Sequence, residues 1–189
     1  MRKAFFLLLF LGAYQLTRAS GNFTRIPGRL AADTTVHPSN EEFVNEIRPI
    51  LMDTSFHSYY LFIEADPCRF IKFDYDEWEK YGLLEPLSIV IMNELAEKIY
   101  NDKGPYRWRQ EQLRNAVCVG RGKVDSVLAN RKRVKEDLIF FFSKPQFTDD
   151  GAYAVIDCNT GCGHDCGSQT TCIFKRMGKS WKMVGRHIY

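Results

Sequence analysis

The chain has 189 residues, of which 45% are apolar, 14% aromatic and 26% charged. These proportions exclude a disordered or collagen-like chain, and the length suits one domain with a hydrophobic core. The formal charge of +3 depends on the N-terminus: without Arg2, Lys3 and Arg18 the 26 basic residues fall to 23, equal to the 23 acidic ones. This neutrality argues against a nucleic-acid partner, although residues 20–104 are acidic overall and residues 105–189 basic.

The first 19 residues have the three parts of a Sec signal peptide: a basic start, an apolar run over residues 4–14, and small residues at Thr17 and Ala19 for cleavage. As a helix the apolar run spans about 17 Å, roughly half of the hydrocarbon core, so no permanent membrane span is expected. We expect cleavage after Ala19, with the region Ser20–Gly21 as the alternative, and a secreted or periplasmic protein. The sequon at Asn22 has meaning only in a eukaryotic host.

Residues 20–38 are predicted to form an irregular leader and residues 39–189 a single α+β domain. Ser39 and Glu42 have the spacing of a capping box, which predicts a helix start. A strand is expected at Ser58 to Glu64, with an antiparallel partner at Cys68 to Tyr75. The clearest helix is expected from Pro86 to Asn101, with Leu84, Ser88, Ile91, Met92, Leu95 and Ile99 on one face.

Further helices are expected at Arg107 to Val117, with Trp108, Leu113 and Ala116 inward, and at Val124 to Asn130. From Leu138 the apolar period becomes two, which predicts strands. Their ranges are Leu138–Ser143, Ala152–Cys158, Thr170–Met177 and Trp181–Val184, with tight turns at Gly151 and Gly178 and Trp181 in the core. The predicted fold is therefore α+β, with helices in the N-terminal part packed on a C-terminal antiparallel meander of about four strands.

The six cysteines follow a predicted export signal, a context in which cysteines normally form disulfides. Six cysteines allow 15 pairings. The pairing we favour joins Cys158 to Cys172 at the base of a long glycine-rich loop and Cys162 to Cys166 within it, which leaves Cys68 with Cys118. A disulfide at the loop base would contribute about 3 kcal/mol by restricting the unfolded chain.

A zinc site is the main alternative for these cysteines. Cys158, Cys162, Cys166 and Cys172, with His164, have suitable donors, but structural zinc motifs usually consist of two short pairs separated by a longer insert. The spacing therefore favours disulfides, and neither a metal nor another cofactor is predicted. Redox chemistry is disfavoured because the chain has no C-x-x-C motif.

Two charged regions and the four histidines are candidates for a functional site. The acidic run Asp74, Asp76, Glu77 and Glu79 fails the EF-hand pattern and indicates a solvated face. The arginines and lysines from Arg107 to Arg133 are expected to pair within the chain. None of the four histidines lies in a nucleophile motif. His164 and Asp165, with Gln169, form the best candidate binding loop, because loops on a rigid scaffold often bind ligands.

Four segments resemble an uncharacterised bacterial exported domain, found often in Bacteroidota, with the pattern FSxPxF, DGxYAxV, CGxxCG and GxW. They are Phe142 to Phe147, Asp150 to Val155, Cys162 to Gly167 and Gly178 to Trp181. The family has no assigned activity, so the resemblance implies the strand meander and the Cys162–Cys166 bridge but no catalytic residue. Cys158 and Cys172 lie outside the pattern, which fits an additional bridge, and this chain lacks the lipid-anchoring cysteine that relatives can carry.

These observations favour an exported, disulfide-stabilised, monomeric domain with a non-enzymatic binding or envelope role. The alternative is a small extracytoplasmic hydrolase with a shallow site near His164 and Asp165. A cleft with convergent polar groups beside that loop would favour the enzyme, and a filled apolar sheet face would exclude it. A zinc domain, the third reading, would retain metal on purification and unfold with chelator.

Overall fold

The computed structural model describes residues 37–52, 58–66, 68, 78–102, 104–129, 138–161 and 167–189. The predicted signal peptide and loop 162–166 lie outside these ranges, as do most of the leader, of the strand at 68–75 and of the acidic run. The elements are α1 (Asn40–Leu51), β1 (Tyr59–Phe62), β2 (Glu64–Ala65), the π-helical turn η1 (Trp78–Gly82), α3 (Ile89–Asn101), β3 (Tyr106–Arg107), the 3-10 turn η2 (Gln110–Gln112), β4 (Ala116–Val119), α4 (Arg121–Leu128), β5 (Ile139–Phe142), β6 (Gln146–Phe147), β7 (Tyr153–Gly161), β8 (Gly167–Met177) and β9 (Ser180–Ile188).

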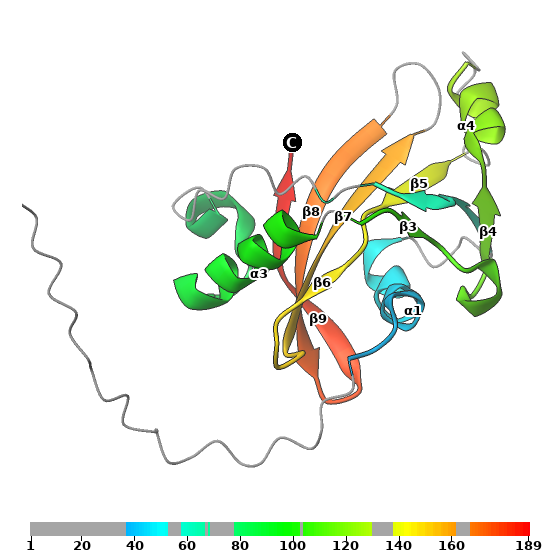
Figure 1. Cartoon of the computed structure of the whole chain (residues 1–189). Coiled ribbons are helices and arrows are strands. Elements are labelled where there is room, and N and C mark those ends of the chain that lie inside the picture. Colours follow the sequence, from blue (N-terminus) through cyan, green and yellow to red (C-terminus); the bar gives the residue numbers. More distant parts are fainter. Residues whose placement is uncertain are drawn as a thin grey trace, which may run out of the picture. The chain divides into compact units, whose positions relative to one another are not determined.

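The fold is α+β and is built on a seven-stranded sheet in the order β4-β1-β5-β7-β8-β9, with β6 paired to β7. Strands β7, β8 and β9 form the predicted antiparallel meander (Figure 1). The prediction of about four antiparallel strands behind N-terminal helices is wrong in two respects. The sheet is larger and mixed, since β1 runs parallel to both β4 and β5, and the helices are interspersed among the strands.

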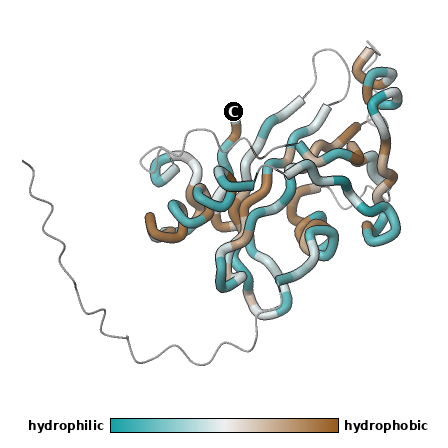
Figure 2. Tube along the Cα trace, in the orientation of Figure 1, coloured by the Kyte–Doolittle hydropathy of each residue, from teal (hydrophilic) through white to brown (hydrophobic). Residues whose placement is uncertain are grey.

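Helices cover both faces of the sheet, because side chains alternate between the faces along each strand. The first cluster of buried residues joins α1 to one face and contains Phe43, Phe142 and Ile156. The second cluster joins η1 and α3 to the opposite face through Trp78, Met92, Leu95, Val155 and Ile173. A third, smaller cluster packs α4 against β1, β4 and β5. Apolar and polar stretches alternate around the turns of α1, as an amphipathic helix requires (Figure 2).

The predicted capping box is confirmed at the start of α1. The Glu42 backbone N–H donates to Ser39 Oγ at 3.2 Å, and the Ser39 backbone N–H donates to Glu42 Oε2 at 2.8 Å. These bonds satisfy backbone donors that the first turn of a helix leaves without partners. Pro49 lies inside the last turn of the helix without ending it.

Helix α3 begins at Ile89, three residues later than predicted. Ser88 is the N-cap, and its Oγ accepts from the Val90 N–H at 3.2 Å, so Pro86 lies outside the helix. Met92 and Leu95 are fully buried as predicted, whereas Leu84 is 62% exposed and does not belong to the apolar face. No helix within the described ranges is both long and apolar enough to cross a membrane.

The predicted helix at Arg107 to Val117 is wrong. Its residues form β3, the single turn η2 and β4 instead. Trp108, Leu113 and Ala116 are buried as predicted, but Trp108 and Leu113 reach the core from irregular segments and Ala116 from strand β4. Asn115 has a φ of 60°, which breaks any helix at this point, and the backbone after it pairs with β1.

The two predicted glycine turns are confirmed. Gly151 and Gly178 have φ of 64° and 66°, values that favour glycine, and they connect β6 to β7 and β8 to β9. The short helix expected near residue 124 is present as α4, which begins at Arg121. Trp181 is 6% exposed and packs in the first cluster as predicted.

Candidate functional site

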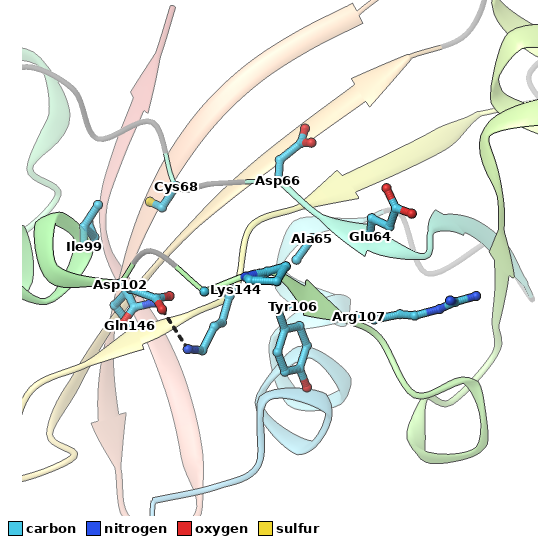
Figure 3. A pocket seen from close by; sticks show the side chains of 12 residues that line it. Glu64, Ala65, Asp66, Cys68, Ile99, Asp102, Tyr106, Arg107, Lys144 and Gln146 are labelled. Atoms are coloured by element: carbon cyan, nitrogen blue, oxygen red, sulfur yellow. Dashed lines mark hydrogen bonds and ion pairs between the residues drawn. The ribbon is translucent and has the colours of Figure 1, made fainter.

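A cavity of about 660 Å³ opens where the β2–β3 pair meets the end of α3 and the link from β5 to β6 (Figure 3). Its volume lies within the range typical of small-molecule sites, about 300–1,000 Å³. Its lining combines charged and apolar side chains and consists of Glu64, Ala65, Asp66, Cys68, Ile99, Asp102, Gly104, Pro105, Tyr106, Arg107, Lys144 and Gln146. We call this cavity the β2–β3 pocket.

The walls of the β2–β3 pocket are positioned by backbone pairing. Glu64 lies opposite Arg107 and Ala65 opposite Tyr106 in the antiparallel β2–β3 pair. The Trp108 N–H extends this pairing by donating to the Ile63 carbonyl at 2.9 Å. Ala65 lines the pocket and is partly buried against the first cluster.

Asp102 is held in the pocket wall by both its backbone and its carboxylate. It is the C-cap of α3, and its backbone N–H donates to the Lys98 carbonyl at 3.0 Å. Its carboxylate accepts from Lys144 Nζ at 3.0 Å and from Gln146 Nε2 at 2.5 Å. The helix dipole places partial negative charge at this end of α3, which favours a cation such as Lys144 beside it. The pocket therefore contains a preformed pair of opposite charges.

The position of Tyr106 is held by a hydrogen bond to the buried carboxylate of Glu41 on α1. Its hydroxyl donates to Glu41 Oε1 at 2.6 Å, and Arg109 donates to the same carboxylate through Nε, Nη2 and its backbone N–H at 2.8 to 3.2 Å. Glu41 is 0% exposed. Burial alone would raise the pKa of Glu41, but the hydrogen bonds from Arg109 and Tyr106 outweigh it and lower the pKa to about 2. This network holds the wall that Tyr106 forms.

The described lining of the pocket contains a thiol, carboxylates, an amine and no histidine. Cys68 is the thiol among the described lining residues, and Lys144 is an amine. In the portions of the chain that the structure describes, no group of three or more His, Cys, Asp or Glu side chains could hold a metal ion. The geometry suits binding of a small molecule with both polar and apolar parts.

Replacing Lys144 by methionine should change the free energy of unfolding by less than about 1 kcal/mol, because both partners of the Lys144–Asp102 pair are partly solvated. Their side chains are 35% and 21% exposed. Chemical denaturation of the variant checks this. A loss of several kcal/mol would show that the pair serves folding and would weaken its assignment to the pocket.

The structure brings two of the predicted disulfide partners together. Cys158 and Cys172 lie on the same face of neighbouring strands, with Cys158 opposite Thr170 and Cys172 opposite Ile156. Their thiols are separate but share a hydrogen bond, and burial, followed by that bond, raises the pKa of Cys158. The two positions are offset by two residues in the register of the β7–β8 pair. Their bridge stays a prediction.

The remaining predicted site residues are not gathered at one place. Cys68 packs against the second cluster, and Cys118, on β4, packs against the first, so their predicted bridge also stays a prediction. Gln169 lies on β8 opposite Asn159. Cys162, His164, Asp165 and Cys166 lie outside the described residues, so their predicted roles stay untested.

Disulfide mapping by mass spectrometry of the non-reduced protein tests the pairing. We expect a linked pair of peptides containing Cys158 and Cys172, because the two residues lie on one face of neighbouring strands, two positions apart in register. A linkage from Cys158 to Cys68, or a free Cys172 in oxidised protein, would contradict the pairing.

Sequence reasoning missed the β2–β3 pocket. Its lining comes from residues 64–68, 99–107 and 144–146, which no local pattern connects. The usable signals were indirect, namely the stop signal Gly104-Pro105 after a strong helix and the alternating polar residues Lys144 and Gln146.

Comparison of the chain with protein-family models, with curated proteins and with solved structures finds no match in any of the three.

Proposed function

We propose that the chain is an exported, non-enzymatic binding domain that holds a small molecule of mixed polar and apolar character in the β2–β3 pocket. The observation that carries the proposal is the Asp102–Lys144 pair at the wall of a 660 Å³ cavity. The apolar parts of the lining, Ile99, Ala65 and Pro105, would contact the carbon body of the ligand, and the charged residues would fix its orientation.

The non-enzymatic part of the proposal is supported by the composition of the lining. The hydrolase alternative depends on His164 and Asp165, which lie outside the described residues. The described lining offers carboxylates, cations, an amide and one thiol, and it contains no histidine. Such a set of groups favours recognition of a ligand over its chemical conversion.

The exported part of the proposal is supported by the sequence of the first 19 residues and by the resemblance of residues 138–185 to an exported bacterial domain. Expression with the complete N-terminus, followed by intact-mass measurement of the exported protein, tests it. We expect a chain beginning at Ser20. Retention in the cytoplasm with Met1 or Arg2 at the N-terminus would contradict export.

Ligand-observed NMR with a library of small amines, carboxylates and zwitterions tests the binding function. We expect hits for the unaltered protein that are lost in Ala65→Trp, because the indole would fill the space between β2 and α3. Leu84→Trp is the matched control, since Leu84 is 62% exposed and is not a lining residue. Hits that survive in Ala65→Trp, or a library without any hit at millimolar concentration, would overturn the proposal.

If Ala65→Trp does not fold, Lys144→Met provides the second variant. It removes one charge of the pocket wall with little expected effect on stability. Circular dichroism establishes that each variant is folded before binding is compared. Unchanged affinities for all hits in Lys144→Met would count against the pocket as their site.

A further inference from the structure

Two side chains of opposite charge in the β2–β3 pocket lie next to each other without pairing. They are Glu64 on β2 and Arg107 on β3, which are directly opposite in the antiparallel pair and both line the cavity. Side chains in this relation have Cβ atoms about 4.5–5.5 Å apart, which is close enough for an ion pair. Within the described residues, however, neither the Glu64 carboxylate nor the Arg107 guanidinium forms a hydrogen bond or an ion pair.

The other carboxylates of the lining are already engaged. Asp102 accepts from Lys144 Nζ at 3.0 Å and from Gln146 Nε2 at 2.5 Å. Asp66 also has an interaction within the chain. A carboxylate without such partners keeps all its acceptor positions for a ligand, and a guanidinium keeps its five N–H donors.

The unpaired charges lie together at one end of the pocket. In the view of Figure 3, Glu64 and Arg107 are at one end of the lining and Ile99 is at the other, with Ala65 and Tyr106 between them. A ligand that reaches both ends therefore meets a carboxylate and a guanidinium with its polar part and an apolar side chain with its far part.

The proximity of Glu64 to Arg107 restricts the charge of the occupant. A guanidinium binds a carboxylate through two parallel hydrogen bonds, and a carboxylate accepts from an ammonium group. A ligand carboxylate bound to Arg107 lies near the carboxylate of Glu64, which repels it unless the ligand also carries a positive charge at that position. Opposite charges so close together are a property of the α-carbon of a free amino acid.

We propose that the ligand of the β2–β3 pocket is a zwitterionic α-amino acid. Arg107 binds its carboxylate, Glu64 binds its ammonium group, and its side chain extends into the cavity towards Ile99. The cavity of about 660 Å³ has room for the side chain as well as the charged groups. This inference rests on the proposed binding function of the pocket and names the class of its ligand.

Isoleucine-methyl NMR titrations with three related compounds test the proposal. L-Leucine carries both charges, isoamylamine is leucine without the carboxylate, and isocaproate is leucine without the amine. We expect leucine to shift the Ile99 methyl signal in a saturable manner. It should bind at least about tenfold more tightly than either of the other compounds, because each of them loses one set of charged hydrogen bonds.

Glu64→Gln and Arg107→Gln assign the two charges. Both residues are exposed, so both variants should remain folded. Glu64→Gln should weaken the binding of leucine and strengthen that of isocaproate, because the carboxylate that repels isocaproate is gone. Arg107→Gln should weaken the binding of leucine and strengthen that of isoamylamine. Glu111→Gln, at an exposed residue of η2 outside the lining, is the matched control and should bind all three compounds like the unaltered protein.

Equal affinities of the three compounds for the unaltered protein would overturn the assignment of a zwitterion. A saturable Ile99 shift with amines or carboxylates of the screen, when no amino acid gives one, would also overturn it. In both cases the pocket binds a ligand, so the proposed binding function stands. If no compound of the screen moves the Ile99 signal, the binding function fails and this inference fails with it.

Discussion

Replacing Phe43 by alanine is expected to lower the free energy of unfolding by about 3–5 kcal/mol, the usual cost of removing a buried phenylalanine. Phe43 is 0% exposed and holds α1 to the sheet. Its ring packs edge-on against Phe147, Phe174 and Trp181, with centroid separations of 5.2, 5.7 and 4.9 Å. Such aromatic pairs add stability beyond the area that they bury.

Urea unfolding of Phe43→Ala measures this effect, and Ile50→Ala is the matched control on the same helix. Ile50 is 42% exposed, so its truncation should cost less than about 1 kcal/mol. Equal losses in the two variants would contradict the assignment of Phe43 as the main anchor of α1.

Replacing Glu41 by alanine is expected to cost about 2–3 kcal/mol at pH 7, because four hydrogen bonds from Tyr106 and Arg109 lose their acceptor. The side chain of Arg109 is 50% exposed, and the solvent can therefore take over part of its hydrogen bonding. The expected cost is accordingly smaller than for a fully buried ion pair.

The contribution of Glu41 to the free energy of unfolding should decrease as the pH falls. Its pKa is about 2 in the folded chain against an ordinary value of 4.5, so the stabilisation is fully present above about pH 5. It is lost as the pH falls from 4.5 towards 2, because the unfolded chain binds the proton first. Unfolding at pH 7 and at pH 3 measures this change.

Glu41→Gln and Glu46→Gln are the variants that isolate this effect. The stability difference between the unaltered protein and Glu41→Gln should shrink on acidification, because the glutamine does not titrate. Glu46 is exposed on the same helix, so Glu46→Gln should follow the unaltered protein throughout. A difference between the unaltered protein and Glu41→Gln that stays constant from pH 7 to pH 3 would contradict the charged network.

Local signals in the sequence located those parts of the fold that local contacts determine. The Ser39 and Glu42 spacing predicted the start of α1, and Gly151 and Gly178 predicted the turns that build the β7–β9 meander. In each case the residues that form the feature are neighbours in the chain. The hydrogen bonds or backbone angles involved can therefore be inferred from residue type and spacing.

The errors arose where distant segments determine the structure. The inward positions of Trp108, Leu113 and Ala116 suggested a helix, but pairing of β4 with β1, more than fifty residues earlier, outweighs that local preference. Parallel pairing of this kind has no turn signal. For the same reason the sequence did not reveal the β2–β3 pocket, whose walls come from three separate parts of the chain.

The isoleucine-methyl NMR spectrum of the protein, recorded while a hit from the ligand screen is added, tests the proposed binding function most directly. Ile99 lines the β2–β3 pocket, whereas Ile47 and Ile156 are fully buried in the first cluster. We predict that bound ligand shifts the Ile99 methyl signal in a saturable manner and leaves the signals of Ile47 and Ile156 in place. A ligand that binds without moving the Ile99 signal would contradict the assignment of this pocket as the functional site.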